Sequence, residues 1–549
     1  MGNPPYHDAA LETVDTNNDN LADLKHSELH VEEVAIARLT DEQVFELSRE
    51  SLRFKSWTSF RISLYMVVQG FNQAGYGIDW AVISGINAFK PWHAFFGVGT
   101  SGVTYATINA LMTIGTVCGA PFLSGADIIG RRGMNFVGNL IVLLAALLQG
   151  FSTGLPMFMA GRFFLGFGSA LMSSPQYIGE VAPAHLRGRL MGIFGSCFQV
   201  GSLVMNGAMI GFAKIEGNWG WRIPLLLEGL CPAIVCLTIF FFTPESPRFY
   251  VMRDKEEKAR QVIARYQTTE GDNPNHRLCD VMIMQIKESL ATENSRDRNV
   301  WDFRPFFRKG ARFRVFVLVL YSFFQQWNGG GIIGQYLVPA LETIGIDGTM
   351  EQLGINLGQV AVYFTFMLVG AFIIDKFYRR TLIFAGLIAF ILFQTLVTIT
   401  SWRFLIDGTK VEAGLTITWV FLFQVCSATL IATMHNLYPV EILSLALRAR
   451  GMALYGLIQG AAGTANQYGI SVGINKIGYK IWTVFIAYNC IQLVLSYFFF
   501  PETYGLSLEE IDTVFETPGV SPVKMSLQIQ KAKKEKAKLE EERAANAEL

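Results

Sequence analysis

The chain has 549 residues and a formal net charge of zero, with 45 basic and 45 acidic side chains. This balance excludes a broadly basic protein that binds nucleic acid along its surface, and we expect no nucleic-acid partner. Hydrophobic residues make up 51% of the chain and charged residues only 16%, whereas an average soluble domain carries about 25% charged residues. The composition therefore predicts a protein embedded in a lipid bilayer.

The N-terminal region, residues 1–57, is the first element along the chain. Its first part is polar and acidic, so we expect a cytoplasmic tail without a cleavable signal peptide. The seven cysteines of the whole chain show no spacing typical of metal ligands. We therefore expect neither a metal site nor a cofactor.

Twelve apolar stretches follow, each close to the roughly 20 residues that a helix needs to cross a bilayer. They lie near residues 60–86, 104–124, 134–152, 156–179, 189–213, 222–243, 313–340, 354–374, 381–401, 415–438, 449–473 and 480–500. This pattern predicts an all-α membrane protein with twelve transmembrane helices. Residues 58–243 and 313–500 would each form a six-helix bundle, and residues 244–312 would link the two bundles.

The linker 244–312 and the C-terminal region 501–549 carry mixed charges at helical spacing. Such spacing predicts short amphipathic helices in the linker and a solvated helix over residues 525–549. We interpret both segments as cytoplasmic. For the C-terminal tail, a regulatory or trafficking role is the alternative interpretation.

The short loops indicate the orientation of the bundles. Arginines cluster in alternate loops, near residues 131–132, 187–189, 379–380 and 448–450, whereas loops 87–103 and 341–353 carry few cations. Because positively charged loops remain in the cytoplasm, we predict that both termini and the linker are cytoplasmic.

Short motifs of charged residues and proline occur twice, once in each half of the chain. The pairs are Asp127–Arg132 with Asp375–Arg380, Glu180 with Glu441 (each followed by an Arg-Gly pair, Arg187-Gly188 and Arg450-Gly451), and Pro244-Glu245 with Pro501-Glu502. Their offsets are 248, 261 and 257 residues. A duplicated six-helix unit explains this repetition, and many transporters place a central site between two such halves.

Charged groups at a membrane boundary need partners, and arginine matches a carboxylate with two hydrogen bonds. We therefore predict that Arg131 or Arg132 clamps Glu180, and that Arg379 or Arg380 clamps Glu441. Such clamps would hold a cytoplasmic gate closed. The alternative interpretation is a positive anchor at the membrane surface with no gating role.

These motifs resemble those of the major facilitator superfamily and, within it, the sugar porter family. The resemblance covers residues 70–515 and includes Asp127-x-x-Gly-Arg-Arg132, Gly161-Arg162, Tyr177-x-x-Glu180, Pro244-Glu-Ser-Pro-Arg248 and Pro501-Glu-Thr503. Gln326-Trp-Asn-Gly329 and the motif from Tyr438 to Gly451 are most similar to the fungal lactose and cellodextrin permeases. The resemblance implies transport at the plasma membrane. The gate residues that we predict are Asp127, Arg131, Arg132, Glu180, Arg187, Glu245, Arg248, Asp375, Arg379, Arg380, Glu441, Arg448, Arg450 and Glu502.

Asp79 is the one acid within the first predicted span. An ionised aspartate at mid-membrane costs roughly 2.5–3.5 kcal/mol on insertion scales, so it needs a partner or a proton. We predict that Arg162 is this partner and that Asp79 carries the coupling proton, as the resemblance to proton-coupled sugar porters also implies. The alternatives are a structural pair that never titrates, or an acid that simply meets water.

The seventh predicted span offers groups suited to a sugar, because amides both donate and accept hydrogen bonds and aromatic rings cover its apolar face. We predict a helix break at Gly329–Gly331, of the kind that transporters place near their sites. Polar contacts between helices are the alternative interpretation. The predicted solute-binding residues are Gln325, Gln326, Asn328, Tyr336, Gln199, Asn466 and Trp80.

Several positions depart from the family pattern. Gly195 replaces an amide of the fifth span, and Glu228 stands where a glutamine is common. The other departures are Gln335, Tyr363, Tyr378 and Asn436. Because several fall on sugar contacts, the pocket is reshaped and suits a disaccharide, a polyol or another metabolite.

We predict a secondary transporter that moves a sugar or sugar-like solute with a proton, by alternating access, as a monomer in the bilayer. The alternative is a facilitator or exporter of a non-sugar metabolite or organic acid. A nutrient sensor is a weaker interpretation, since the C-terminal tail is short. An enzyme is not expected, because the chain lacks a nucleophile triad, a phosphate-binding loop and paired catalytic carboxylates.

Overall fold

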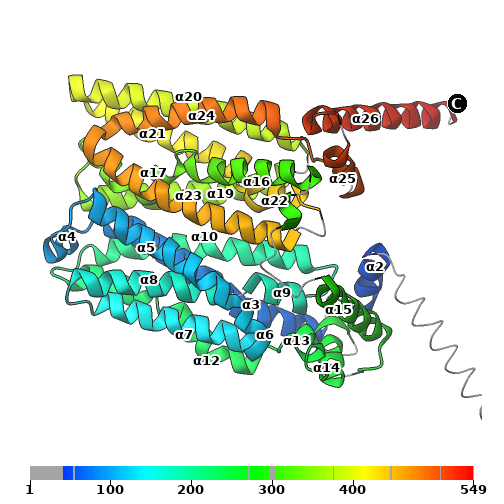
Figure 1. The fold of residues 1–549 in the computed structure, drawn as a ribbon. Helices are drawn as coiled ribbons and strands as arrows, with labels where there is room; N and C mark the ends of the chain where they lie inside the picture. The colour runs from blue at the N-terminus through cyan, green and yellow to red at the C-terminus, as the bar shows by residue number, and fades with distance from the viewer. Residues whose placement is uncertain are drawn as a thin grey trace, which may run out of the picture. The chain divides into compact units, whose positions relative to one another are not determined.

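The structure, a computed structural model, describes most of the chain in ten stretches. They are residues 41–53, 56–172, 174–269, 273–296, 304–307, 309–374, 376–444, 448–506, 508–517 and 519–547. Every regular element in these stretches is a helix, and none of them contains a strand. The predicted all-α fold is confirmed (Figure 1).

The chain divides into two compact units. Unit 1 comprises Met1–Tyr65, Pro175–Met191 and Pro244–Arg298, and unit 2 comprises Met66–Ser174, Gly192–Thr243 and Asn299–Leu549. Unit 2 therefore holds most of the residues from both predicted bundles. The predicted domain boundaries stay a prediction.

Helices cover all six predicted spans of the first half. They are α3 (Trp57–Ile86), α4 (Lys90–Phe96), α5 (Val103–Gly119), η1 (Ala120–Gly125), α6 (Ala126–Ile129), α7 (Arg131–Gly150), α8 (Leu155–Leu171), α9 (Ser174–Val181), α10 (Arg187–Phe212), α11 (Trp219–Leu227) and α12 (Leu230–Phe242). The short helix α4 was not predicted.

Glycines let α5 and α8 approach closely. A Cβ atom built on Gly115 would lie 2.1 Å from the carbonyl oxygen of Phe163, and one on Gly166 would lie 2.0 Å from that of Met112. Neither position can therefore accept a side chain at this helix separation. Small residues at helix contacts are typical of membrane bundles, where packing replaces the hydrophobic effect. Helix α7 packs against α8 on its other side (Figure 1).

Helices also cover the predicted spans of the second half. They are α16 (Lys309–Trp327), α17 (Gly330–Gln335), α18 (Leu337–Glu342), α19 (Thr349–Ile373), α20 (Arg379–Asp407), α21 (Lys410–Cys426), the π-helical turn η3 (Ser427–Ala432), α22 (Met434–Ile442), α23 (Arg448–Ile477), η4 (Gly478–Lys480) and α24 (Ile481–Phe499). Helix α20 packs against both α21 and α24.

The seventh predicted span is broken. Helix α16 ends at Trp327, Gly329 has a φ of 92°, and α17 begins at Gly330. Residues other than glycine rarely adopt such a positive φ. Asn328 lies just before the new helix, and its Oδ1 accepts a hydrogen bond from the backbone N–H of Gly330 at 2.8 Å. The predicted helix break is confirmed.

Nine helical stretches of the described residues are long and apolar enough to cross a membrane. One of them, Arg450–Phe499, covers both α23 and α24. The broken seventh span and the polar helix α3 fall outside these nine stretches. A full set of twelve crossings therefore stays a prediction.

Unit 1 contains the helices of the predicted linker. They are α13 (Pro247–Val251), α14 (Glu256–Gln267) and α15 (Arg277–Arg296), and the short η2 (Arg304–Phe307) follows in unit 2. Unit 1 also contains α2 (Asp41–Ser51), which lies in the predicted N-terminal tail. The N-terminal helix α2 packs through Val44 against a small core that contains Ile263 and Leu278. Short helices predicted in the linker are thus present.

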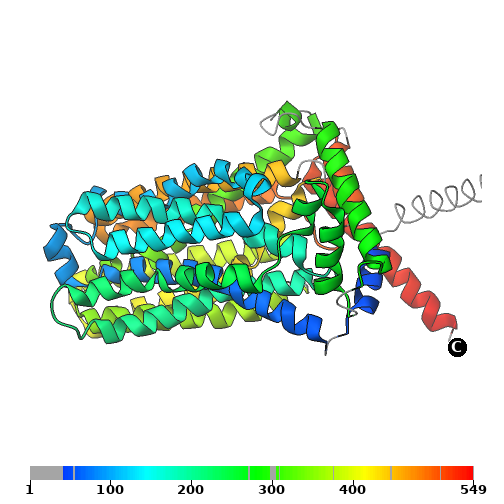
Figure 2. The same ribbon diagram turned by 90° about the horizontal axis from the view of Figure 1, so that it is seen from below.

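Two helices follow the last predicted span. They are α25 (Leu508–Glu516) and α26 (Pro522–Ala547), so the helix predicted over residues 525–549 is present up to Ala547. The far end of α26 extends beyond α24 (Figure 2). Its beginning packs against α24 and α25.

Candidate functional site

Asp79 and Arg162 form a buried ion pair. Asp79 lies on α3 and Arg162 on α8, and their side chains are 2% and 1% exposed. Nη1 of Arg162 lies 2.5 Å from Oδ1 of Asp79. The other carboxylate oxygen, Oδ2, has no hydrogen-bond partner in the described part of the chain. The structure thus brings together the two residues predicted to couple transport to protons, and their role stays a prediction.

A second buried acid, Glu228, lies beside this pair. It follows α11 and is 1% exposed. Nε2 of Gln149 donates a long hydrogen bond, 3.4 Å, to Oε2 of Glu228, whereas Oε1 has no partner among the described residues. Glu228 was noted in the sequence only as a departure from the family pattern.

Asp79 and Glu228 line the same small cavity, of about 10 Å³. Tyr76 and Ser169 contribute to its walls. A cavity of about 10–15 Å³ holds one water molecule when polar groups surround it. Asp79 and Glu228 are thus two buried acids at one cavity, and Arg162 forms its ion pair with Asp79.

The amides of the seventh span lie beside the tenth and eleventh spans. Nε2 of Gln325 donates to the hydroxyl of Tyr321 at 2.7 Å, and its Oε1 lies 3.3 Å from Nδ1 of His435. On α23, Nε2 of Gln459 donates to the hydroxyl of Tyr455 at 2.7 Å. These amides and phenols form a polar cluster, which we call the amide cluster. Its hydrogen-bond capacity suits a hydroxylated solute.

Other predicted solute-binding residues support the helix break. Nδ2 of Asn466 donates to the backbone oxygen of Gln326 at 2.7 Å. The hydroxyl of Tyr336 donates to the backbone oxygen of Gln467 at 3.1 Å. The backbone oxygen of Asn328 accepts from Nε2 of Gln394 at 2.7 Å. The side-chain contacts of Asn466, Asn328 and Tyr336 thus stabilise irregular backbone, and contact with a solute stays a prediction for each.

Trp80 and Gln199 are the two predicted solute-binding residues of the first half. Trp80, on α3, is half-buried, and its ring packs edge-on against Tyr76 with centroids 6.4 Å apart. Gln199, on α10, is also half-buried. Around Gly195, one turn earlier, a built Cβ would meet no atom within 4 Å. The fifth span therefore has open space at Gly195, the position where the motif resemblance implies an amide.

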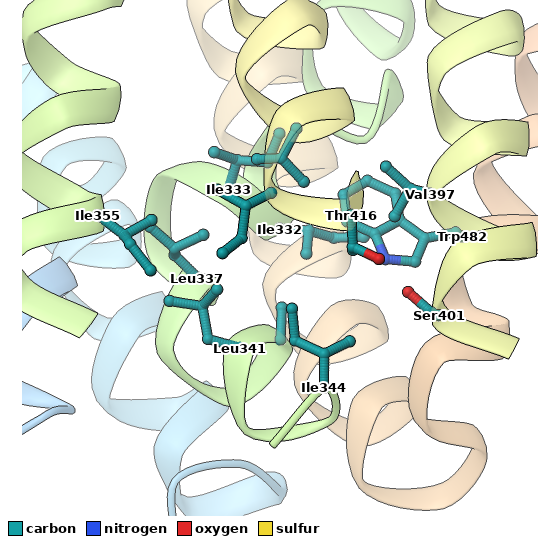
Figure 3. A pocket seen from close by; sticks show the side chains of 13 residues that line it. Ile332, Ile333, Leu337, Leu341, Ile344, Ile355, Val397, Ser401, Thr416 and Trp482 are labelled. Atoms are coloured by element: carbon teal, nitrogen blue, oxygen red, sulfur yellow. The ribbon is translucent and has the colours of Figure 1, made fainter. Parts of the chain in front are cut away.

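A separate apolar cavity lies behind the helix break (Figure 3). Its volume is about 20 Å³, and Ile333, Leu337 and Trp482 are among its lining residues. Ser401 and Thr416 add the hydroxyl groups visible in Figure 3. This space fits about one water molecule, so it is too small for a sugar.

The predicted clamp of the second half is formed. Nη2 of Arg379 lies 3.3 Å from Oε1 of Glu441, and the hydroxyl of Thr503 donates to Oε2 of Glu441 at 2.5 Å. Glu502 accepts hydrogen bonds from the backbone N–H groups of Arg379 and Arg380 at 2.9 and 3.0 Å. These contacts tie the start of α20 to the end of α22 and to the segment after α24.

In the first half, Arg131 pairs with its neighbour in sequence. Its Nη1 lies 2.6 Å from Oδ1 of Asp127 and 3.0 Å from the carbonyl oxygen of Ala126. Nη1 of Arg132 donates to the carbonyl oxygen of Thr243 at 3.4 Å. Glu180 belongs to the other unit, so its clamp with these arginines stays a prediction.

Within unit 1, Glu180 repeats a contact of Glu441. The hydroxyl of Ser246 donates to Glu180, as that of Thr503 does to Glu441. The hydroxyl of Tyr177 likewise donates to the backbone oxygen of Pro244, and that of Tyr438 to Pro501. The duplicated motifs thus form duplicated contacts.

The six remaining predicted gate residues lie at the following positions. Arg187 begins α10 and is exposed, Glu245 is buried beside Ser246, and Arg248 lies on α13. Arg450 lies in the first turn of α23 and is half-buried. Asp375 and the side chain of Arg448 lie outside the described residues.

At the opposite end of unit 2, hydrogen bonds join the two halves of the chain. The hydroxyl of Thr100 donates to Glu342 at 2.8 Å, and that of Ser471 donates to the backbone oxygen of Gly102 at 2.8 Å. The hydroxyl of Thr349 donates to the backbone oxygen of Ala88 at 2.9 Å. We call this set of contacts the distal tie.

The sequence profile of the family described as "Sugar (and other) transporter" matches residues 64–515. The chain belongs to this transporter family. Sugar transport protein MST7 of Oryza sativa subsp. japonica is 27% identical over 395 residues, which cover 70% of this chain and 75% of that protein. Myo-inositol transporter 2 of Cryptococcus neoformans var. grubii is also 27% identical, over 90% of both chains.

Solved structures support the fold of this transporter. The inward open conformation of the xylose transporter XylE from E. coli superposes with a TM-score of 0.67 at 19% identity, and it covers 82% of this chain and 99% of that chain. The structure of a D-xylose-proton symporter gives a TM-score of 0.64, also at 19% identity, over 81% of this chain and 99% of that one. At this identity the likeness shows the fold alone.

Several polar groups of the candidate site of this transporter were not predicted from the sequence. Tyr321, Tyr455 and Gln459 join the amide cluster, although only their mutual position in the folded protein reveals this. Ser246 and Thr503 lie within the duplicated motifs, and their equivalent positions could have indicated a shared contact.

Proposed function

We propose that this transporter carries a sugar or sugar-like solute together with a proton. The observation that supports coupling is the buried ion pair of Asp79 with Arg162, beside which a second buried acid, Glu228, lines the same cavity as Asp79. The names of several relatives, which are sugar transport proteins and a myo-inositol transporter, support a polyhydroxylated solute. The motif resemblance to the fungal lactose and cellodextrin permeases supports a disaccharide as one candidate solute.

The proposed mechanism begins at Asp79. When Asp79 is ionised, it holds Arg162, and α3 stays tied to α8. A proton on Asp79 removes its charge, so that Arg162 turns to the remaining acid, Glu228. This exchange of partners loosens α3 from α8 and favours the movement of the two halves, while the solute binds at the amides of α16 and α23.

The distal tie supports an inward-facing state of the transporter. It closes the end of the bundles opposite the arginine-rich loops, which we predict to face outward because positive loops remain in the cytoplasm. We therefore propose that the structure is inward-facing, with the solute chamber closed to the outside. We also propose that the protein acts as a monomer in the plasma membrane, with both termini cytoplasmic.

The decisive experiment compares uphill and downhill transport in proteoliposomes with a panel of labelled sugars and polyols. Asp79→Asn should abolish accumulation driven by a proton gradient, because the amide cannot exchange a proton, and it should leave exchange between equal solute pools intact. Asp407→Asn, the same change at an exposed position on α20, is the control and should accumulate normally. Accumulation by Asp79→Asn would disprove the coupling.

The second candidate is a facilitator or exporter of another metabolite, including an organic acid. The open space around Gly195 favours this alternative, since a missing amide removes one contact that a sugar would use. If Gln326→Ala leaves the affinity for every tested sugar unchanged while the protein reaches the membrane, the solute site lies elsewhere and the second candidate gains support.

A further inference from the structure

A cavity of about 570 Å³ lies where α20 begins and α24 ends. Helix α26 closes it on one side through Val523, Lys524 and Leu527, whereas Arg380 and Tyr497 line it from the two membrane helices. Cavities of roughly 300–1,000 Å³ are typical of sites for small ligands. This cavity is distinct from the amide cluster and from the Asp79–Arg162 pair, which lie on other helices.

Arg380 supplies a buried positive charge to this cavity. The residue is 8% exposed, and its Nη2 donates to the carbonyl oxygen of Tyr497. Its Nε has no hydrogen-bond partner, and the guanidinium forms no ion pair within 4 Å in the described stretches. It lies over the rings of Phe384 and Tyr497, at 5.2 and 5.3 Å from their centroids. Because a buried charge without a hydrogen-bonded anion is costly, this site favours an anion.

The one carboxylate of the cavity wall is already occupied. Glu502 accepts hydrogen bonds from four backbone N–H groups, those of Arg379, Arg380, Thr503 and Tyr504, at 2.9–3.1 Å. Its oxygens therefore face the backbone rather than the guanidinium. Lys524 adds a second, exposed cation at the cavity wall.

The outer wall of the cavity is apolar and open. Tyr497 and Phe498 are each 60% exposed, and Leu527 is 45% exposed. Both α20 and α24 belong to stretches that can cross a membrane, so their shared end lies at a membrane boundary. Aromatic side chains at such a boundary contact both headgroups and acyl chains. The wall thus suits a molecule with an anionic head and an apolar tail.

We propose that this cavity binds one anionic glycerophospholipid of the surrounding membrane. Its phosphate lies between Arg380 and Lys524, and its acyl chains lie along Tyr497, Phe498 and Leu527. By occupying the space between α26 and the two membrane helices, the lipid fixes the C-terminal helix to the bundle. The proposal rests on the membrane position of the fold and is independent of the transported solute.

The test is native mass spectrometry of the full chain in detergent, titrated with phosphatidylserine or with phosphatidylcholine. We expect one phosphatidylserine to bind at least about tenfold more tightly than phosphatidylcholine. Lys524→Gln should weaken phosphatidylserine binding about fivefold, the usual effect of one cation near an anionic lipid. Leu527→Asp should weaken it further, because it places a negative charge against the acyl chains.

Lys531→Gln is the matched control. It makes the same change on the same helix at a residue that is 81% exposed and does not line the cavity, so binding should not change. Three results would overturn the proposal: equal affinity for the two lipids, equal weakening by Lys524→Gln and Lys531→Gln, or displacement of phosphatidylserine by about 10 mM inorganic phosphate. The last result would indicate a site for free anions.

Discussion

At the scale of single residues, the balance of charge around Arg162 determines how the first half is held together. Removing one member of a buried ion pair leaves the other without compensation, which costs about 3–5 kcal/mol. Arg162 is the ion-pair partner of Asp79, and Glu228 lies at the same cavity; Oδ2 of Asp79 and Oε1 of Glu228 have no hydrogen-bond partner among the described residues. The three residues should therefore respond to substitution as one unit.

We predict that Arg162→Gln lowers the free energy of unfolding by about 3–5 kcal/mol, because the buried carboxylate of Asp79 loses its ion-pair partner. The double variant Asp79→Asn/Arg162→Gln should recover most of this loss. Thermal unfolding in detergent, followed by tryptophan fluorescence, measures both. If the double variant is no more stable than Arg162→Gln, the two side chains are not energetically coupled.

At the scale of elements, the approach of α5 to α8 sets the position of Arg162. The carbonyl oxygens of Met112 and Phe163 occupy the space that side chains would need at Gly166 and Gly115. Because Arg162 lies one residue before Phe163, any widening of this contact also moves the guanidinium. Helix packing and the ion pair are thus linked.

Gly115→Ala should separate α5 from α8 and lower the free energy of unfolding by at least about 1–3 kcal/mol, the usual cost of overpacking. Gly195→Ala is the matched control, since its new methyl group would meet no atom within 4 Å. Helix propensity alone would make either change favourable by up to about 1 kcal/mol. Equal thermal stability of the two variants would contradict the role of the contact.

The elements also show how far the sequence can be interpreted. Hydropathy located the helices, three glycines indicated the break at Gly329, and the aspartate of the first span indicated its partner Arg162. The role of Glu228 was not predictable, because its proximity to Asp79 depends on how α3 packs beside the α11–α12 junction. The cavity at Arg380 was not predictable either. It depends on the packing of the beginning of α26 against α24, which no local sequence pattern specifies.

At the scale of the whole molecule, the distal tie holds together helices from both halves of the chain. Glu342 is its one titratable member among the contacts described. Burial raises the pKa of Glu342 above the ordinary value, an effect larger than the opposite one of the hydrogen bond from Thr100. A carboxyl group whose pKa is raised because a closed state buries it favours that closed state in its protonated form.

The distal tie should therefore be strongest below the ordinary pKa of glutamate, and it should weaken as the pH rises through the raised pKa of Glu342. Hydrogen exchange of residues 98–106, corrected for its intrinsic pH dependence, measures this closure. We expect about twofold more protection at acidic than at neutral pH, on the scale of a half-exposed polar contact. Glu342→Gln keeps an acceptor for Thr100 and should remove this pH dependence; an unchanged pH dependence would assign the effect to another group.

The contacts of Tyr177 with Pro244 and of Tyr438 with Pro501 lie at equivalent places in the two halves of the chain. In each copy, the partner proline lies beyond the sixth helix of its half. The duplicated pattern therefore extends past the last membrane helix of each half, to Ser246 in one and Thr503 in the other. Helices α14 and α15 follow it in the first half and α25 and α26 in the second, so each half completes its shared contacts before its cytoplasmic additions are predicted to begin.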